Sequence, residues 1–395
     1  MHMKFSEDPK NNYFFSKPHQ PFFVLAFINA AVAMLIYLLA YKGMIILAVK
    51  PSVFHSYTLI YLMFTPAFFA FLFTTFPRFS STREVETKSY MQVFTLYYLG
   101  AVLYLLGSIV SPIFSAVAMM LLFAGQFKGV MILHNIYQTT SIEDEHDTAW
   151  ILYAMKIGVL SHLLFIVAKL FLMPLMDFSI QVSLYLYLFL LTFTIAWRMV
   201  PLFSNLAVEK NEKFFKIIFA LLVLHLLLES IVTSSSFMVD LALGVIIGKE
   251  LLSWKLPFPK KDPLLWILHL GIYWIPLAFI VAALSNFLTL ILGIDFLFLD
   301  MHILVLGFLL TILIGLSTRV TLGHSGNNLQ PDNWVKGLFV WTQVVVLVRI
   351  LTSIISALGW NFTVLFDIAA TLWIILFCAW ALRFFTVLIT GKKLT

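Results

Sequence analysis

Ten histidines in a chain of 395 residues that is 62% hydrophobic are the residues best suited to chemistry. An imidazole inside a membrane usually faces a bundle interior, a partner group or a metal ion. Taken singly, each histidine is more simply a core side chain bonded to a backbone carbonyl or a hydroxyl. Histidines spread over several helices suit a haem iron or a copper ion, and their spacing does not choose between the two metals.

The depth of each histidine along its apolar run predicts two pairs. His55 and His302 lie at the outer ends of their runs, whereas His269 and His324 lie towards the inner ends. We therefore expect an inner metal or haem-iron site at His269 and His324. A separate outer metal site is expected at His55 and His302.

The stretch "TRVTLGHSGNN" ends an apolar run with a cation and an imidazole. Gly323 and Gly326 flank His324, and the conformational freedom of glycine predicts a tight turn that directs the imidazole back towards the helices. The alternative is a solvated turn histidine. Arg319 and Arg198 each lie at an inner helix end, where an arginine either reaches lipid phosphate or clamps a carboxylate such as a haem propionate.

Other ionisable residues lie well inside apolar runs. Arg349 and Asp367 are at comparable depth on either side of a short hairpin, which predicts a structural ion pair that limits the cost of burying both charges. His225 and Glu229 are one helical turn apart and share a face.

Membrane helices must position these residues, because only 11% of the chain is charged, against about 25% in soluble proteins. Some 20 apolar residues cross a bilayer. Runs of that length predict helices at residues 21–41, 54–76, 90–110, 112–133, 150–173, 179–200, 214–232, 237–254, 263–285, 298–318, 334–357 and 362–390. The expected fold is an all-α polytopic bundle of about twelve transmembrane helices, with no evident internal repeat. The single cysteine, Cys378, excludes a disulfide framework and a thiolate cluster.

The positive-inside rule assigns the sides of the membrane. Basic residues gather in the loops of one face: Lys4, Lys10, Lys17, Arg78, Arg83, Lys88, Arg198, Lys210, Lys213, Lys216, Lys249, Lys255, Lys260, Lys261, Arg319, Lys336, Lys392 and Lys393. The opposite loops carry little beyond Lys42 and Lys50. Both termini are therefore predicted to be cytoplasmic, with a cytoplasmic segment at 1–20, one transmembrane domain at 21–390 and a tail at 391–395. The net charge of +6 reflects this topology, not a nucleic-acid partner.

Several of these stretches resemble the NnrS family. "DMHILVLGFLLTILIGLSTRVTLGHSGNNL" is similar to the family's late signature, a helix with a histidine near its start and an R-V-x-L-G-H-x-G end. "DPLLWILHLGIYWIPLAF", "WRMVPLFSNLA" and "HQPFF" resemble further family segments. The resemblance implies a twelve-helix protein of the bacterial inner membrane that contains haem and copper and is linked to nitric oxide metabolism and nitrosative stress. It carries over through His55, His269, His302, Arg319 and His324.

The chain departs from the family pattern at four positions. Where the family shows W-H-x-H-E, "FHSYT" has Tyr57 and Thr58 in place of the second histidine and the glutamate. Asn327 and Gln20 stand where the family has arginines. These departures leave the copper content less well supported than the fold.

The leading functional hypothesis is a haem- and copper-binding protein that handles nitric oxide, with the lipid bilayer and nitric oxide or a nitrosyl species as partners. The alternative is a secondary transporter without haem, favoured by about twelve spans, buried polar residues and helix prolines such as Pro66 and Pro276. A membrane assembly factor without chemistry is a third possibility. Neither adjacent histidines nor an H-P-E segment occurs, which argues against a haem-copper oxidase or respiratory nitric oxide reductase. Both turnover and simple binding of nitric oxide are compatible with the sequence.

Overall fold

The computed structural model describes residues 13–142, 145–208, 212–257, 262–329 and 332–394, and within them the chain forms helices and no strands. Eleven of the described helices are long and apolar enough to cross a membrane. A twelfth apolar helix, α11 (Phe237–Ser253), is slightly shorter than these, with 17 residues. The prediction of an all-α membrane bundle of about twelve helices is therefore confirmed. Of the cations used to assign the sides, Lys4, Lys10, Lys210, Lys260 and Lys261 lie outside the described residues.

The remaining helices agree closely with the apolar runs. After the 3-10 turn η1 (Tyr13–Phe15), they are α2 (His19–Tyr41), α3 (Pro51–Tyr57), η2 (Thr58–Phe64), α4 (Thr65–Phe79), α5 (Thr87–Val110), α6 (Pro112–Gln138), α7 (His146–Leu170), η3 (Met173–Leu175), α8 (Met176–Gln181), η4 (Val182–Phe189), α9 (Leu190–Phe203), α10 (Glu212–Ile231), α12 (Pro263–Leu292), α13 (Leu299–His302), η5 (Ile303–Leu310), α14 (Thr311–His324), α15 (Asn333–Ala357) and α16 (Thr363–Thr390). The tight connection between α5 and α6 is a true break. Ser111 caps α6 by accepting the Ile113 N–H at 3.3 Å, and Pro112 takes the first helical position.

A threefold repeat, which the sequence pattern did not reveal, organises the helices. Three helices are interrupted by a π-helical stretch: α3–η2–α4, α8–η4–α9 and α13–η5–α14. Each follows one long helix (α2, α7 or α12) and precedes two more (α5 and α6, α10 and α11, α15 and α16). The long helices of the described residues thus form three successive sets of four with the same order of elements.

The three interrupted helices share further features. In their most apolar windows 94%, 72% and 78% of residues are buried, against 33% to 56% in the other spans. Arg78, Arg198 and Arg319 lie near their C-terminal ends at nearly equal intervals along the chain. Thr65 and Thr311 directly follow the first and third π-helices, and their hydroxyls donate to the carbonyls five residues earlier at 2.7 and 3.1 Å. The same local device therefore recurs in two of the repeats.

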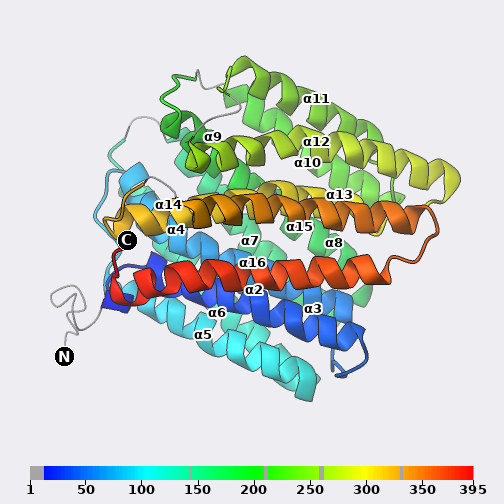
Figure 1. Cartoon of the computed structure of the whole chain (residues 1–395), viewed down its shortest axis with the longest axis horizontal. Helices are drawn as coiled ribbons and strands as arrows, with labels where there is room; N and C mark the ends of the chain where they lie inside the picture. The colour runs from blue at the N-terminus through cyan, green and yellow to red at the C-terminus, as the bar shows by residue number, and fades with distance from the viewer. Residues whose placement is uncertain (1–12, 143–144, 209–211, 258–261, 330–331, 395) are drawn as a thin grey trace. The chain divides into compact units, whose positions relative to one another are not determined.

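The described chain divides into two compact units. The first comprises Met1–Leu188, Ser317–Leu329 and Trp373–Thr395, and the second comprises Phe189–Leu316 and Gln330–Leu372. Figure 1 shows α5 and α6 of the first unit side by side. Gly125 permits this approach, since a Cβ there would lie 2.9 Å from the Tyr97 ring.

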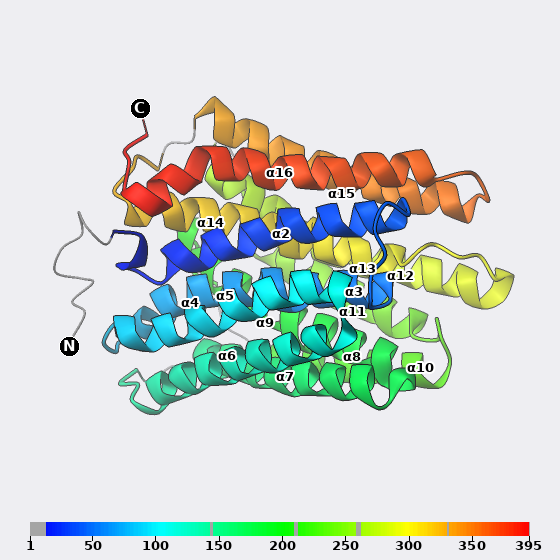
Figure 2. The same cartoon turned by 90° about the horizontal axis from the view of Figure 1, so that it is seen from below.

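Helices from the two ends of the chain pack together in the first unit. The Trp373 indole N–H donates to the Ala30 carbonyl at 3.0 Å, so that α16 lies along α2 (Figure 2). A Cβ at Gly391 would lie 2.9 Å from the Tyr13 ring. The described ends of the chain therefore lie on the same side of this unit, which agrees with an even number of spans.

In the second unit, polar bonds join α12, α14 and α15. The Trp274 indole N–H donates to the Gln343 side-chain oxygen at 2.9 Å, and the Gln343 amide donates to the Thr311 hydroxyl at 3.1 Å. Satisfying buried polar groups in this way fixes the positions of three apolar helices that offer few other directional contacts.

Candidate functional site

His324 is the last residue of α14, and the helix runs through Gly323 without a turn. The reversal comes two residues later: Gly326 has φ of 64°, and the Asn327 N–H bonds the Leu322 carbonyl at 3.0 Å in a Schellman-type cap. The expected turn around Gly323 is therefore wrong. Helical phase, and not a turn, directs the imidazole, whose Nδ1 lies 3.1 Å from the Val320 carbonyl.

His19, the first residue of α2, is the ring neighbour of His324 in the first unit. The two ring centres are 4.9 Å apart with an interplanar angle of 50°. His19 is 2% exposed. Its Nδ1 and the Nε2 of His324 are both buried and make no hydrogen bond within the described residues. The pair therefore offers two imidazole nitrogens that no group in the described part of the chain bonds.

The sequence carried a partial signal for this pair, since His324 was expected towards the inner end of its apolar run. Their contact could not be deduced because the first helix and the tenth are far apart in the chain. The hydrogen bond of His324 Nδ1 to a backbone carbonyl is the arrangement that typically leaves Nε2 as a metal ligand.

Charged groups surround the pair. Lys17 forms an ion pair with Glu84 at 2.7 Å. The hydrogen bond from Lys17 lowers the pKa of Glu84 below its usual range, and the positive charges of Lys17 and Arg78 lower it further, while partial burial opposes them. The Lys393 ammonium donates to the Ser325 carbonyl, which ties the end of α16 to the cap of α14.

The geometry of the pair distinguishes between the two metal groups. Imidazoles that share one haem iron stand on opposite faces of the macrocycle, and with metal–nitrogen bonds of about 2 Å their ring centres lie roughly 6 Å apart. A bent arrangement at a single metal ion brings the centres to about 5 Å with the same bonds. The observed 4.9 Å leaves no room for a macrocycle. The two rings are closer than an axial pair on haem would be, whereas two imidazoles at one metal ion would lie about this far apart.

The other predicted ligands have identified neighbours in their own units. Nε2 of His269 lies 2.8 Å from the Ser204 hydroxyl. The ring of His55 stacks on Tyr37, with centres 4.5 Å apart. Because His55 and His324 belong to the first unit while His269 and His302 belong to the second, both predicted pairings join the two units and stay predictions.

Nδ1 of His302 has two neighbours that compete for it. The Phe298 carbonyl lies at 2.8 Å and the Arg349 guanidinium at 3.1 Å. A protonated Nδ1 donates to Phe298 and leaves Nε2 as the ligand atom, whereas an unprotonated Nδ1 accepts from Arg349. The tautomer of His302 therefore decides whether it can bind a metal through Nε2.

The arginines take different positions. Arg319 lies five residues before His324 in α14, and Arg198 lies near the end of α9, and both are half-buried. Their role as propionate clamps stays a prediction. Arg349 also donates to the Leu297 carbonyl at 2.8 Å. Its predicted pairing with Asp367 is not tested by these contacts.

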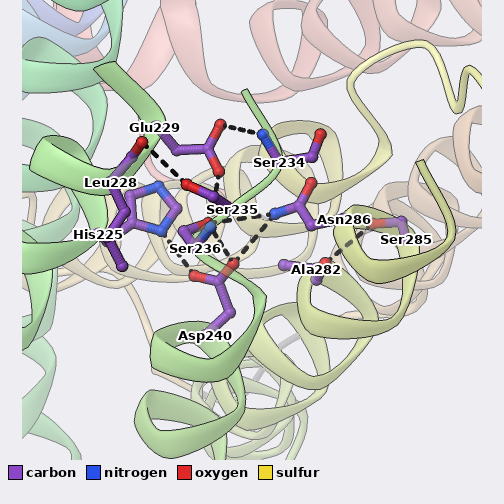
Figure 3. Close-up of polar contacts among 10 residues, drawn as sticks. All are labelled: His225, Leu228, Glu229, Ser234, Ser235, Ser236, Asp240, Ala282, Ser285 and Asn286. Carbon is purple, nitrogen blue, oxygen red and sulfur yellow. Dashed lines mark hydrogen bonds and ion pairs between the residues drawn. The ribbon is translucent and has the colours of Figure 1, made fainter. Parts of the chain in front are cut away.

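A second polar cluster lies in the second unit (Figure 3). His225 Nδ1 and the Asp240 carboxylate are 2.6 Å apart, and Asp240 also accepts from the Ser236 hydroxyl at 2.8 Å and the Asn286 amide at 3.0 Å. Glu229, expected beside His225, accepts backbone N–H groups of Ser234 and Ser236 instead. The cluster joins α10, α11 and α12 through satisfied hydrogen bonds. It therefore stabilises the packing of these three helices.

No group of three or more histidine, cysteine or carboxylate side chains in the described ranges is close enough to hold a metal ion. Among the described residues, histidine, cysteine and carboxylate side chains therefore offer a metal ion no more than two ligands at one place. The model of the NnrS protein family matches residues 13–392, nearly the whole chain. The chain belongs to the NnrS family. No curated protein matches the sequence. Family membership supports a multi-pass membrane protein related to nitric oxide, and within the NnrS signature His324 is the residue that the structure pairs with His19.

Proposed function

We propose that this NnrS-family protein binds copper and haem in a bacterial inner membrane and handles nitric oxide, either as metabolite or as toxin. The family match covers residues 13–392 and supports the link to nitric oxide. Copper and haem iron each supply a site that binds nitric oxide reversibly when the metal is present.

The observation that carries the proposal is the His19–His324 pair. Two buried nitrogens without hydrogen-bond partners would each cost roughly 1 to 3 kcal/mol in an apolar interior, and a copper ion between them removes that cost. Imidazole nitrogen is a preferred copper ligand. We assign copper to His19 and His324.

With copper assigned to His19 and His324, the remaining candidate histidines are left as ligands of the haem iron. We propose His302, His55 and His269 as candidate axial ligands, with Arg319 and Arg198 as candidate partners of the propionates. The Phe298 carbonyl 2.8 Å from His302 Nδ1 supports His302, because in the tautomer that donates to this carbonyl Nε2 would be the ligand atom. The chain's own contribution is to orient these imidazoles and to exclude water.

The experiment is cofactor analysis of the purified protein after expression with haem and copper supplied. We expect a Soret band and about one copper per chain. Replacing Arg319 by Lys should weaken haem retention less than replacing it by Ala, since the charge survives but the two-pronged contact does not.

Replacing His19 or His324 by Ala should lower the copper content and leave the Soret band. His134→Ala is the matched control, because His134 is also a half-buried helix histidine with an unbonded Nδ1. Wild-type protein that holds neither haem nor copper contradicts the proposal and favours the transporter.

A further inference from the structure

Tyr57 and His162 form a buried phenol–imidazole pair in the first unit. The Tyr57 hydroxyl lies 2.8 Å from His162 Nε2, and both residues are 0% exposed. Tyr57 stands where the family motif has its second histidine. The substitution therefore places an oxidisable phenol against an imidazole.

Gln126 sets the direction of the hydrogen bond. His162 Nδ1 lies 2.7 Å from the Gln126 side-chain oxygen, which only accepts, so Nδ1 carries the proton. Nε2 is then an acceptor, and the Tyr57 hydroxyl donates to it. The pair is a phenol bonded to a base.

Tyr61 completes the surroundings of the imidazole. Its ring stacks on His162 with centres 3.8 Å apart and planes at 16°. An aromatic face at this distance stabilises a cationic ring, and the Nδ1–H bond to Gln126 grows stronger when the imidazole is charged. These two contacts offset part of the cost of charging His162 in an otherwise apolar interior.

The π-helix η2 begins directly after Tyr57 and contains Tyr61, and both tyrosine rings contact the ring of His162. π-helical stretches inside α-helices are frequent at functional sites.

We propose that Tyr57 is a one-electron donor to small radical oxidants of the nitrogen-oxide class. Nitrogen dioxide radical takes one electron and becomes nitrite, the Tyr57 O–H bond breaks, and its proton moves to His162 Nε2. The products are a neutral tyrosyl radical, a histidinium and nitrite. A second nitrogen dioxide radical then bonds to the ring carbon beside the phenol oxygen and, after a hydrogen shift, gives 3-nitrotyrosine.

Loss of the phenol proton is what limits such an oxidation in a dry interior. A positioned base typically accelerates proton transfer by about 10²–10⁴-fold. Tyr97 provides the matched comparison, because it is equally buried but its hydroxyl faces Thr65 and makes no hydrogen bond of normal length. The choice of oxidant rests on the proposed function, whereas the proton transfer does not.

The test exposes the full-length protein in anaerobic lipid vesicles to nitrogen dioxide and measures nitration of each tyrosine by peptide mass spectrometry. Tyrosines exposed to lipid, such as Tyr98 and Tyr153, meet the radical directly and serve as dose markers. Among the buried tyrosines, we expect Tyr57 to be nitrated at least about tenfold more than Tyr97 or Tyr61. Freeze-quenched samples should show a tyrosyl EPR signal that Tyr57→Phe lowers and Tyr97→Phe leaves unchanged.

His162→Gln keeps a hydrogen-bond acceptor but not a base, and it should bring Tyr57 nitration down to the level of Tyr97. Equal nitration of Tyr57 and Tyr97 in the wild type overturns the proposal without any variant. Metal-free protein should give the same Tyr57 result. If the protein holds neither haem nor copper but Tyr57 is still nitrated selectively, the proposed function is wrong and the inference about Tyr57 stands.

Discussion

At the scale of single residues, two kinds of buried polar group occur, and their hydrogen bonds separate them. The Asp240 carboxylate accepts from His225, Ser236 and Asn286. His19 and His324 instead each have a buried nitrogen that makes no hydrogen bond in the described part of the chain. A satisfied network stabilises the fold, whereas unbonded nitrogens on two neighbouring rings are available to a ligand.

Replacing Asp240 by Asn should destabilise the protein by about 2 to 4 kcal/mol, because His225 then loses a charged partner in a buried site. Unfolding in detergent, followed by tryptophan fluorescence, measures the loss. Lys249→Gln, an exposed change on the same helix, is the control and should have little effect. If Asp240→Asn is equally harmless, the cluster is not a structural pin.

At the scale of helices, two of the candidate functional residues lie directly before a π-helical stretch. His302 ends α13 immediately before η5, and Tyr57 ends α3 immediately before η2. A π-helical stretch adds a residue to the turn and changes the direction of every side chain after it. Such a shift depends on backbone hydrogen bonds and leaves no sign in the hydrophobic pattern.

Thr311→Val tests whether the threonine after a π-helix is needed. The variant removes the hydroxyl bond to the Leu306 carbonyl and the acceptor for Gln343, and it should cost roughly 1 to 3 kcal/mol. Thr74→Val removes a similar bond, to the Ala70 carbonyl, inside a regular helix. Thr74→Val should cost less than half as much, and equal losses at the two sites would show that the π-helix gives Thr311 no special role.

At the scale of the whole molecule, apolar runs near the thickness of a bilayer predicted the helices well. α14 nevertheless runs to His324, because a helix tolerates Gly323 near its end, so that the expected turn was wrong. The His19–His324 contact joins the first and tenth spans, and residue patterns do not encode such distant contacts. The threefold repeat was missed because it consists mainly of a recurring order of elements and of π-helices, whereas only a few residues, such as Arg78, Arg198 and Arg319, recur with it.

The predicted orientation places the His19–His324 end in the cytoplasm. In a Cys378→Ser background, cysteines introduced at Lys213 and Asn327 should resist an impermeant thiol reagent in intact cells, whereas one at Lys42 should react. The excess of basic residues on one set of loops is the physical reason. Labelling at Lys213 and Asn327 but not at Lys42 would reverse the orientation.

Copper K-edge X-ray absorption of the purified protein tests the central claim most directly. A copper ion held by His19 and His324 should show nitrogen neighbours at about 2 Å and the outer-shell scattering of two imidazoles. Either His19→Ala or His324→Ala should remove one imidazole or the copper itself, while His134→Ala leaves the spectrum unchanged. Copper that keeps its two-imidazole spectrum in both His19→Ala and His324→Ala would contradict the assignment.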